Sequence, residues 1–320
     1  MGGTIAGSAP SATDTSGYRA ATASVDEVLA AVPEVHSIAS IRSEQFAQID
    51  SSDLTDELLI ALARRVDELG NSPDVDGIVI THGTDTLEET AYFLHLVLSH
   101  STPVVLVGSM RPSSALSADG PMNIFGAVAV ATSARSHGQG VLVVMNDSIH
   151  SARDVTKSSS VSVQSFESQH GALGVVVDGE VLFYREVSRP HTSHTEFSLG
   201  SFTTLPSAAV IYAHSGITAS FVDSIVDDSY DVIVHAGFGN GMVPRRLIES
   251  LERARAAGTT IVRASRAASA QLTTVGASAS AANDWIAALD QNPQRSRILA
   301  CLALTVSTDP GEIQRMFHQY

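Results

Sequence analysis

The chain has 320 residues, a formal net charge of −15 and 44% hydrophobic residues, which is enough length for two domains and enough apolar content for a large buried core. The negative charge argues against nucleic acid or an anionic membrane as a partner, because phosphates would be repelled over much of the surface. No stretch reaches the roughly eighteen apolar residues that span a bilayer, so we expect a globular protein.

The first half of the chain alternates strand-like apolar runs with helical patterns. The expected strands are 76–81, 103–108 and 140–147, and the expected helices are 86–99 and 119–134. This alternation is typical of an α/β fold with a doubly wound, mostly parallel sheet that helices cover on both faces.

Local signals mark the starts of these helices and one tight turn. Thr86 and Glu89 predict a capping box, and Asp119 followed by Pro121 predicts a cap with a proline in the first turn. The segment 172–187 predicts a hairpin that turns at Asp178 and Gly179.

A second, smaller α/β pattern follows a segment with few periodic apolar positions. The expected domains are 1–187 and 207–320, joined by a linker at 188–206. Low sequence complexity predicts a surface loop at 269–284. The single cysteine, Cys301, excludes an internal disulfide, and its apolar surroundings favour a buried hydrophobic side chain over a nucleophile.

Polar loops follow the three strands of the first domain, and ligands of α/β sheets bind at the carboxyl ends of strands. THGTDT offers Thr84 and Asp85 at the start of a helix, and QIDSSDL offers Ser51 before another. Asp85 and Ser51 suit helix caps. They also suit a site for an amino acid, in which Asp85 receives the ammonium and Ser51 the carboxylate.

Lys157 is the only lysine, whereas every other cation is arginine. Arginine stays charged, but a buried lysine can lose its proton and act as a base, so Lys157 is either a stray surface residue or a functional one. Thr4 in GGTIAG lies among glycines that let a ligand approach closely, and it needs an activating base to react. Tyr18 lies in a polar stretch able to fold over a ligand, unless it is an ordinary loop aromatic.

Four motifs of the chain carry a resemblance to a known family. GGTIAG, ITHGTDTLEETAYFL, VGSMRPSSALSADGPMN and VLVVMNDSIHSARDVTK together resemble bacterial L-asparaginases of the type II kind, in the asparaginase/glutaminase family. The similarity runs from Gly2 to Tyr320 and is weakest at 158–205 and 266–290.

The resemblance implies an amidohydrolase that converts L-asparagine and water to L-aspartate and ammonia, with weak glutaminase activity as a secondary expectation. By motif position Thr4 is the nucleophile, Tyr18 lies beside it in a mobile lid, and Thr84, Asp85 and Lys157 form a second catalytic group. The implied route passes through a β-aspartyl ester of Thr4, and Lys157 has to be neutral for part of the cycle.

The resemblance also implies binding residues. Ser51 holds the α-carboxylate of the substrate, Asp85 meets its α-ammonium, and the backbone at Ser109 contacts the side-chain amide. Ser52 stands where the family has a glutamine. No cofactor is implied, and twelve histidines without an HExxH motif or paired CxxC spacing do not indicate a metal site.

The chain departs from the family pattern at its start, because no strand precedes GGTIAG. We expect either a misplaced start or a truncated chain. The sequence as given carries no export signal and predicts a cytoplasmic location, whereas a longer natural chain is compatible with a periplasmic or secreted one.

The resemblance implies a homotetramer, built as a dimer of dimers, in which partner residues complete each site. Here Met242 replaces the partner asparagine, and the stretch that supplies the partner glutamate has no carboxylate before Asp284. Two alternatives therefore stay open: a non-catalytic or truncated amino-acid-binding relative, and an amidase component for a larger amidated substrate. The HAGFGNGM stretch fails as a dinucleotide fingerprint, and the absence of a GxSxG elbow argues against a serine hydrolase.

Overall fold

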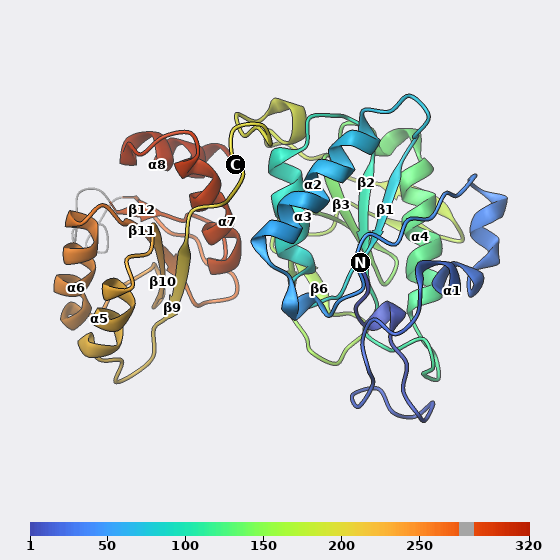
Figure 1. Ribbon diagram of the computed structural model, residues 1–320, viewed down its shortest axis with the longest axis horizontal. Helices are drawn as coiled ribbons and strands as arrows, with labels where there is room; N and C mark the ends of the chain where they lie inside the picture. The colour runs from blue at the N-terminus through green and yellow to red at the C-terminus, as the bar shows by residue number, and fades with distance from the viewer. Residues whose placement is uncertain (275–284) are drawn as a thin grey trace. The chain divides into compact units, whose positions relative to one another are not determined.

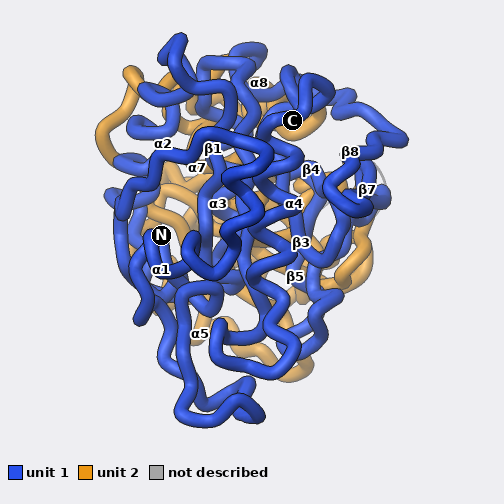
Figure 2. Tube along the Cα trace, turned by 90° about the vertical axis from the view of Figure 1, so that its right-hand side faces the viewer, with its two compact units in different colours: residues 1–195 blue, residues 196–320 orange. Residues whose placement is uncertain are grey.

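A six-stranded sheet forms the centre of the first of two structural units. The computed structural model describes residues 1–274 and 285–320, and it divides into Met1–Thr195 and Glu196–Tyr320 (Figure 2). The loop expected at 269–284 thus lies largely outside the described residues. No helix in the described ranges is both long and apolar enough to cross a bilayer.

The sheet of the first unit has the strand order β1-β2-β3-β4-β7-β8. Its strands are β1 (Ile78–Thr81), β2 (Val104–Val107), β3 (Val141–Met145), β4 (Ser148–Ser151), β7 (Gly174–Val177) and β8 (Glu180–Phe183). The first three strands pair in parallel and the others antiparallel. β2 and β3 are buried along their whole length, as expected for central strands rich in valine and leucine.

Helices cover both faces of this sheet. α2 (Asp56–Gly70) and α3 (Leu87–Val97) pack on one face, and α4 (Gly120–Thr132) packs on the other (Figure 1). The other helical elements of the first unit are a short α1 (Val25–Ala30) and the 3₁₀ turns η1 (Thr4–Ala6), η2 (Pro33–Ser37), η3 (Ser51–Asp53), η4 (Ala134–Ser136) and η5 (Thr192–His194). The predicted α/β class is confirmed.

The predicted helix caps are only partly right. Thr86 and Asp119 are the N-cap residues of α3 and α4, but neither side chain caps its helix. The Thr86 hydroxyl donates to the carbonyl of Ser51 at 2.9 Å, so the predicted capping box is wrong. The Asp119 carboxylate instead accepts the N–H groups of Met110 and Arg111, each at 2.9 Å, and so shapes the loop after β2.

The predicted hairpin is confirmed, and a second small sheet was not anticipated. Asp178 and Gly179 join β7 to β8 with φ values of 53° and 83°, the conformation that tight hairpin turns require. β5 (Val155–Lys157) and β6 (Phe166–Ser168) form a separate antiparallel pair. This pair carries Lys157.

The second unit is a four-stranded parallel sheet with helices on both faces. The strand order is β12-β11-β10-β9, from β9 (Ala208–Tyr212), β10 (Val232–Gly237), β11 (Thr260–Ser265) and β12 (Ile286–Ala287). α5 (Ala219–Asp227) and α6 (Arg245–Ala256) lie on one side, whereas α7 (Pro293–Leu304), followed by α8 (Pro310–Gln319), lies on the other (Figure 1). Cys301 is fully buried in α7, as expected.

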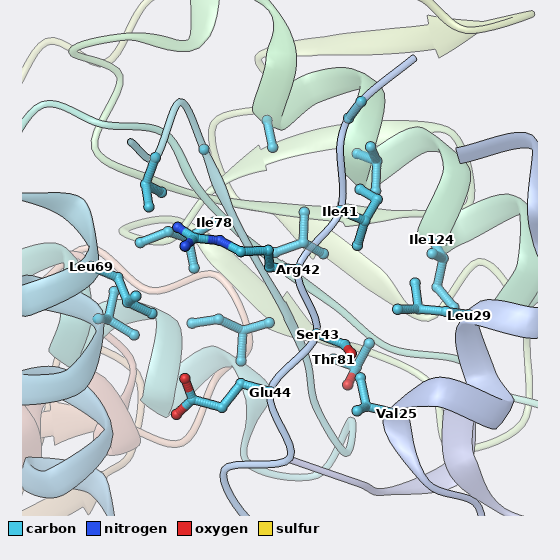
Figure 3. Close-up of a pocket in the computed structure, with 18 of the residues that line it drawn as sticks. Val25, Leu29, Ile41, Arg42, Ser43, Glu44, Leu69, Ile78, Thr81 and Ile124 are labelled. Atoms are coloured by element: carbon cyan, nitrogen blue, oxygen red, sulfur yellow. The ribbon is translucent and has the colours of Figure 1, made fainter. Parts of the chain in front are cut away.

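A groove of about 770 Å³ runs along β1 on the edge away from β2. Ile78 and Thr81 of β1 line it together with the segment through Ile41 and Glu44 (Figure 3). Met1 also lines the groove, and the backbone beside it pairs with Ile49 in parallel. Within the described residues β1 pairs with β2 alone, and no strand precedes η1.

Candidate active site

The loops that carry the candidate residues meet through close backbone contacts. Gly3 has φ 79° and ψ −163°, a conformation open essentially to glycine alone, and a Cβ built on it would overlap the backbone of Gly83. A Cβ on Gly83 would in turn collide with the side chain of Ser51. Three segments far apart in the sequence therefore converge at the ends of the first-unit strands.

Thr4 and Tyr18 form one hydroxyl pair of the site. Thr4 lies in η1 and is 6% exposed, and its Oγ1 is 2.5 Å from the phenol oxygen of Tyr18. Tyr18 is half-buried on a loop that reciprocal backbone hydrogen bonds between Ser8 and Arg19 tie down. The buried Thr4 hydroxyl can therefore exchange a proton directly with the Tyr18 hydroxyl.

Lys157, Thr84 and Asp85 form the second group. The Lys157 ammonium donates to Thr84 Oγ1 at 2.8 Å and to Asp85 Oδ1 at 2.6 Å. The Lys157 side chain is only 18% exposed, whereas that of Asp85 is 63% exposed. The alternative of Asp85 as the cap of α3 is wrong, because Thr86 is the N-cap residue and Asp85 pairs with the lysine.

His82 supports the turn that presents Thr84, and sequence reasoning missed it. Its Nδ1 lies 2.7 Å from the carbonyl oxygen of Gly83 and must donate there, so Nε2 accepts from the Thr90 hydroxyl at 3.0 Å. Burial lowers the pKa of His82 to about 4, so the ring is neutral at pH 7 and keeps this tautomer. Its position at the end of β1 was the signal that could have drawn attention to it.

The three candidate serines differ in their surroundings. Ser51 is buried beside Gly83, and Ser109 is fully buried with its hydroxyl donated to the carbonyl of Arg111 at 2.8 Å. Ser52 is exposed, and its hydroxyl donates to Asp50 at 3.0 Å. Ser51 thus lies next to the loop that carries Thr84, whereas the Ser52 side chain is bound to Asp50.

The positions at which the family resemblance implies partner residues fall in the second unit. Met242 lies between β10 and α6 and is 60% exposed, and Asp284 lies outside the described residues. In residues 1–274 and 285–320, no three His, Cys, Asp or Glu side chains are grouped so that they could hold a metal ion.

Comparison with known proteins shows which family has this architecture. The family model for the asparaginase N-terminal domain matches residues 1–189, and that for the glutaminase/asparaginase C-terminal domain matches residues 208–317. The chain belongs to the asparaginase family. This membership covers both units and every candidate residue of the site.

Relatives within the family match over the whole chain. A glutaminase-asparaginase of Pseudomonas fluorescens biotype A is 44% identical over 100% of the chain and 88% of the relative. L-asparaginase 2 of Escherichia coli is 41% identical over 100% and 91%. The crystal structure of a probable cytoplasmic L-asparaginase from Campylobacter jejuni matches with a TM-score of 0.95 and 40% identity, over 100% of this chain and 97% of that one.

Proposed function

We propose that the protein hydrolyses L-asparagine to L-aspartate and ammonia through an ester of Thr4, with weaker activity on L-glutamine. The observation that carries the proposal is the contact of the only lysine, mostly buried, with Thr84 at 2.8 Å and Asp85 at 2.6 Å. Membership of the asparaginase family and the names of its relatives support the same reaction.

The first half of the reaction forms the ester. Thr4 Oγ1 attacks the carbon of the side-chain amide, and its proton passes to the phenol oxygen of Tyr18, 2.5 Å away, as the phenol gives its own proton up toward the leaving nitrogen. Backbone N–H groups after β1, near Thr84, stabilise the oxyanion. The carbon–nitrogen bond then breaks, and the leaving group takes up a proton to depart as ammonia.

The second half returns the enzyme to its starting state. Lys157, in its neutral form, takes a proton from Thr84, which relays it from the attacking water. Water adds to the ester carbon, the bond to Thr4 Oγ1 breaks, and the proton that Lys157 took up is returned to Thr4 as aspartate leaves.

Substrate recognition uses the two ends of an amino acid. The largely exposed carboxylate of Asp85 receives the α-ammonium, and buried Ser51, with backbone groups near it, receives the α-carboxylate. The backbone at Ser109 contacts the side-chain amide. The hydroxyl of Ser52 is already on Asp50, so we assign Ser52 the smaller share of substrate binding.

An ammonia-release assay tests the proposal. Wild-type protein should release ammonia from L-asparagine faster than from L-glutamine, and Thr84→Val should lower kcat by roughly 10²-fold or more. Ser101→Ala, an exposed serine near the start of β2, is the control for hydroxyl loss. Aspartate binding without ammonia release would overturn the hydrolase and favour a non-catalytic amino-acid-binding relative.

Assembly and location belong to the same proposal. We assign a homotetramer built as a dimer of dimers, and light scattering after size-exclusion chromatography measures it directly. A monomer that turns over asparagine would contradict this state.

We assign a cytoplasmic location to the protein, because the C. jejuni relative is named cytoplasmic. A Haemophilus influenzae relative is named periplasmic. Cell fractionation decides between them.

A further inference from the structure

A buried carboxylate that has no part in the reaction above holds the backbone of Lys157. Glu88 is 5% exposed, and its Oε2 accepts the backbone N–H of Lys157 at 2.6 Å. Glu88 is the second residue of α3, which begins at Leu87. The bond joins a helix of the first unit to the strand that carries the only lysine.

A carboxylate in this place needs strong compensation. Burying an ionised group is costly unless it is hydrogen-bonded, and a bond from an N–H to a carboxylate is among the stronger ones. The first turn of a helix also favours a negative charge. The hydrogen bond from the Lys157 backbone N–H therefore stabilises the buried Glu88 carboxylate, and it fixes the Lys157 backbone next to α3.

The hydrogen bond to Glu88 matters because the strand pairing does not fix Lys157 relative to Thr84. β5, which ends at Lys157, pairs only with β6 among the described strands. It does not belong to the six-stranded sheet, whose strand β1 leads into the loop with Thr84. Pairing within the main sheet thus does not fix Lys157 relative to Thr84. Residues 84–88 instead bind both the side chain and the backbone of Lys157. Thr84 and Asp85 accept hydrogen bonds from Nζ, and Glu88 accepts one from the backbone N–H.

We propose that Glu88 is a positioning residue, which fixes the Lys157 backbone so that Nζ stays on Thr84. This inference rests on the proposed function for its effect on turnover, but its structural part stands alone. A catalytic group displaced by about 1 Å can cost roughly 10²-fold in rate. Loss of the acceptor should therefore slow the reaction while substrate binding through Ser51 and Asp85 continues.

The experiment compares variants at Glu88 with a matched helix position. Glu88→Gln keeps an acceptor oxygen at the same reach, Glu88→Met removes it at similar volume, and Glu88→Asp withdraws the carboxylate by one methylene. Glu57→Met is the control, because Glu57 is the exposed second residue of α2. It removes a first-turn charge without touching Lys157.

We expect Glu88→Met and Glu88→Asp to lower kcat for asparagine by roughly 10- to 100-fold with KM within about 3-fold of wild type. Glu88→Gln should stay within about 3-fold in kcat. If Glu88→Met does not fold, the comparison of Glu88→Gln with Glu88→Asp decides. Full activity of the acceptor-deficient variants, or a Gln variant as slow as they are, overturns the inference.

A second readout does not depend on activity. Because Lys157 is the only lysine, labelling with ¹⁵N-lysine gives one backbone amide signal, which reports this hydrogen bond directly. Hydrogen exchange of that signal should accelerate about 10-fold or more in Glu88→Met and stay near wild type in Glu88→Gln and Glu57→Met. Unchanged exchange in Glu88→Met overturns the inference. If the wild-type protein releases no ammonia, only the proposed function is overturned. The exchange data still test the hydrogen bond between the Lys157 N–H and Glu88.

Discussion

At the residue scale, the proposed mechanism depends on Lys157 acting as a base. Lys157 is mostly buried and its Nζ donates to both Thr84 and Asp85, so one hydrogen bond joins Nζ to the Thr84 hydroxyl. Arginine at this place keeps the ion pair with Asp85 but does not deprotonate in proteins. Charge and basicity can therefore be separated by one substitution.

Lys157→Arg should retain aspartate binding and the folded state but lose at least about 10²-fold in kcat for asparagine. Ammonia release gives the rate, and calorimetric titration with aspartate gives the binding. An arginine variant that turns over asparagine at a wild-type rate would show that the lysine contributes only charge.

At the scale of single elements, the site depends on how closely the turn before η1 approaches the loop after β1. Gly3→Ala places a methyl group against the Gly83 backbone in a φ/ψ region that alanine rarely enters. We expect a loss of about 2 kcal/mol or more in the free energy of unfolding, and a near-complete loss of ammonia release. Denaturant titration and the activity assay measure the two effects.

Gly138→Ala is the matched control for this prediction. Gly138 also has a positive φ, 72°, but a Cβ there meets nothing within 4 Å. Its replacement should cost only about 1 kcal/mol and leave activity intact. Equal effects of the two substitutions would mean that backbone conformation, rather than the Gly3–Gly83 contact, sets the geometry of the site.

Some elements of the fold can be predicted from the sequence and others cannot. Strands such as β2 and β3 and the helix α3 were predictable because their apolar pattern is strong on its own. β5 and β6 have three residues each, too few for a period. The cap at Thr86 was mispredicted because its hydroxyl goes to Ser51, a partner distant in sequence.

The candidate site shows the same division. Thr84, Asp85 and Lys157 were foreseen as a group from motif resemblance, and the structure brings them together. Glu88 was not foreseen, because an acidic residue in the first turn of a helix is normally explained by the helix dipole. Only the folded chain reveals that its carboxylate is buried against Lys157.

At the scale of the whole molecule, buried histidines couple stability to pH. His235 in β10 is fully buried, and neither ring nitrogen has a hydrogen-bond partner in the described part of the chain. Burial lowers its pKa to about 4. The unfolded chain, with an ordinary histidine pKa near 6.5, then binds the proton first as the pH falls.

His235 therefore leaves stability intact above about pH 6.5 and reduces it progressively down to about pH 4, by about 3 kcal/mol in total. His235→Leu should flatten this pH dependence, with His36→Leu at an exposed position as the control for loss of an imidazole. The only tryptophan, Trp285, lies in the core of the same unit, so its fluorescence follows the relevant unfolding. An unchanged slope in His235→Leu would contradict the prediction.

The groove along β1 gives a second prediction at this scale. One edge of β1 is unpaired in the described structure, and the backbone at Met1 already pairs with Ile49 in the direction of a parallel strand. Met1 itself is only 8% exposed, so this part of the chain sits in apolar surroundings. An apolar strand joined to Met1 has the geometry to fill the groove.

A fusion of about six valine- and isoleucine-rich residues before Met1 should raise the melting temperature by roughly 5 °C or more, because it buries apolar surface. A glycine- and serine-rich fusion of equal length is the control. No difference between the two melting temperatures would show that the groove does not accept a strand.

The most direct measurement is the identity of the residue that carries the aspartyl group during turnover. The protein is mixed with asparagine, quenched in acid within milliseconds, digested and analysed by mass spectrometry, with Thr4→Val alongside. We predict an aspartyl adduct on Thr4 in the wild-type protein, with neither adduct nor ammonia from the valine variant. An adduct on another residue, or ammonia release by Thr4→Val at the wild-type rate, would contradict the mechanism.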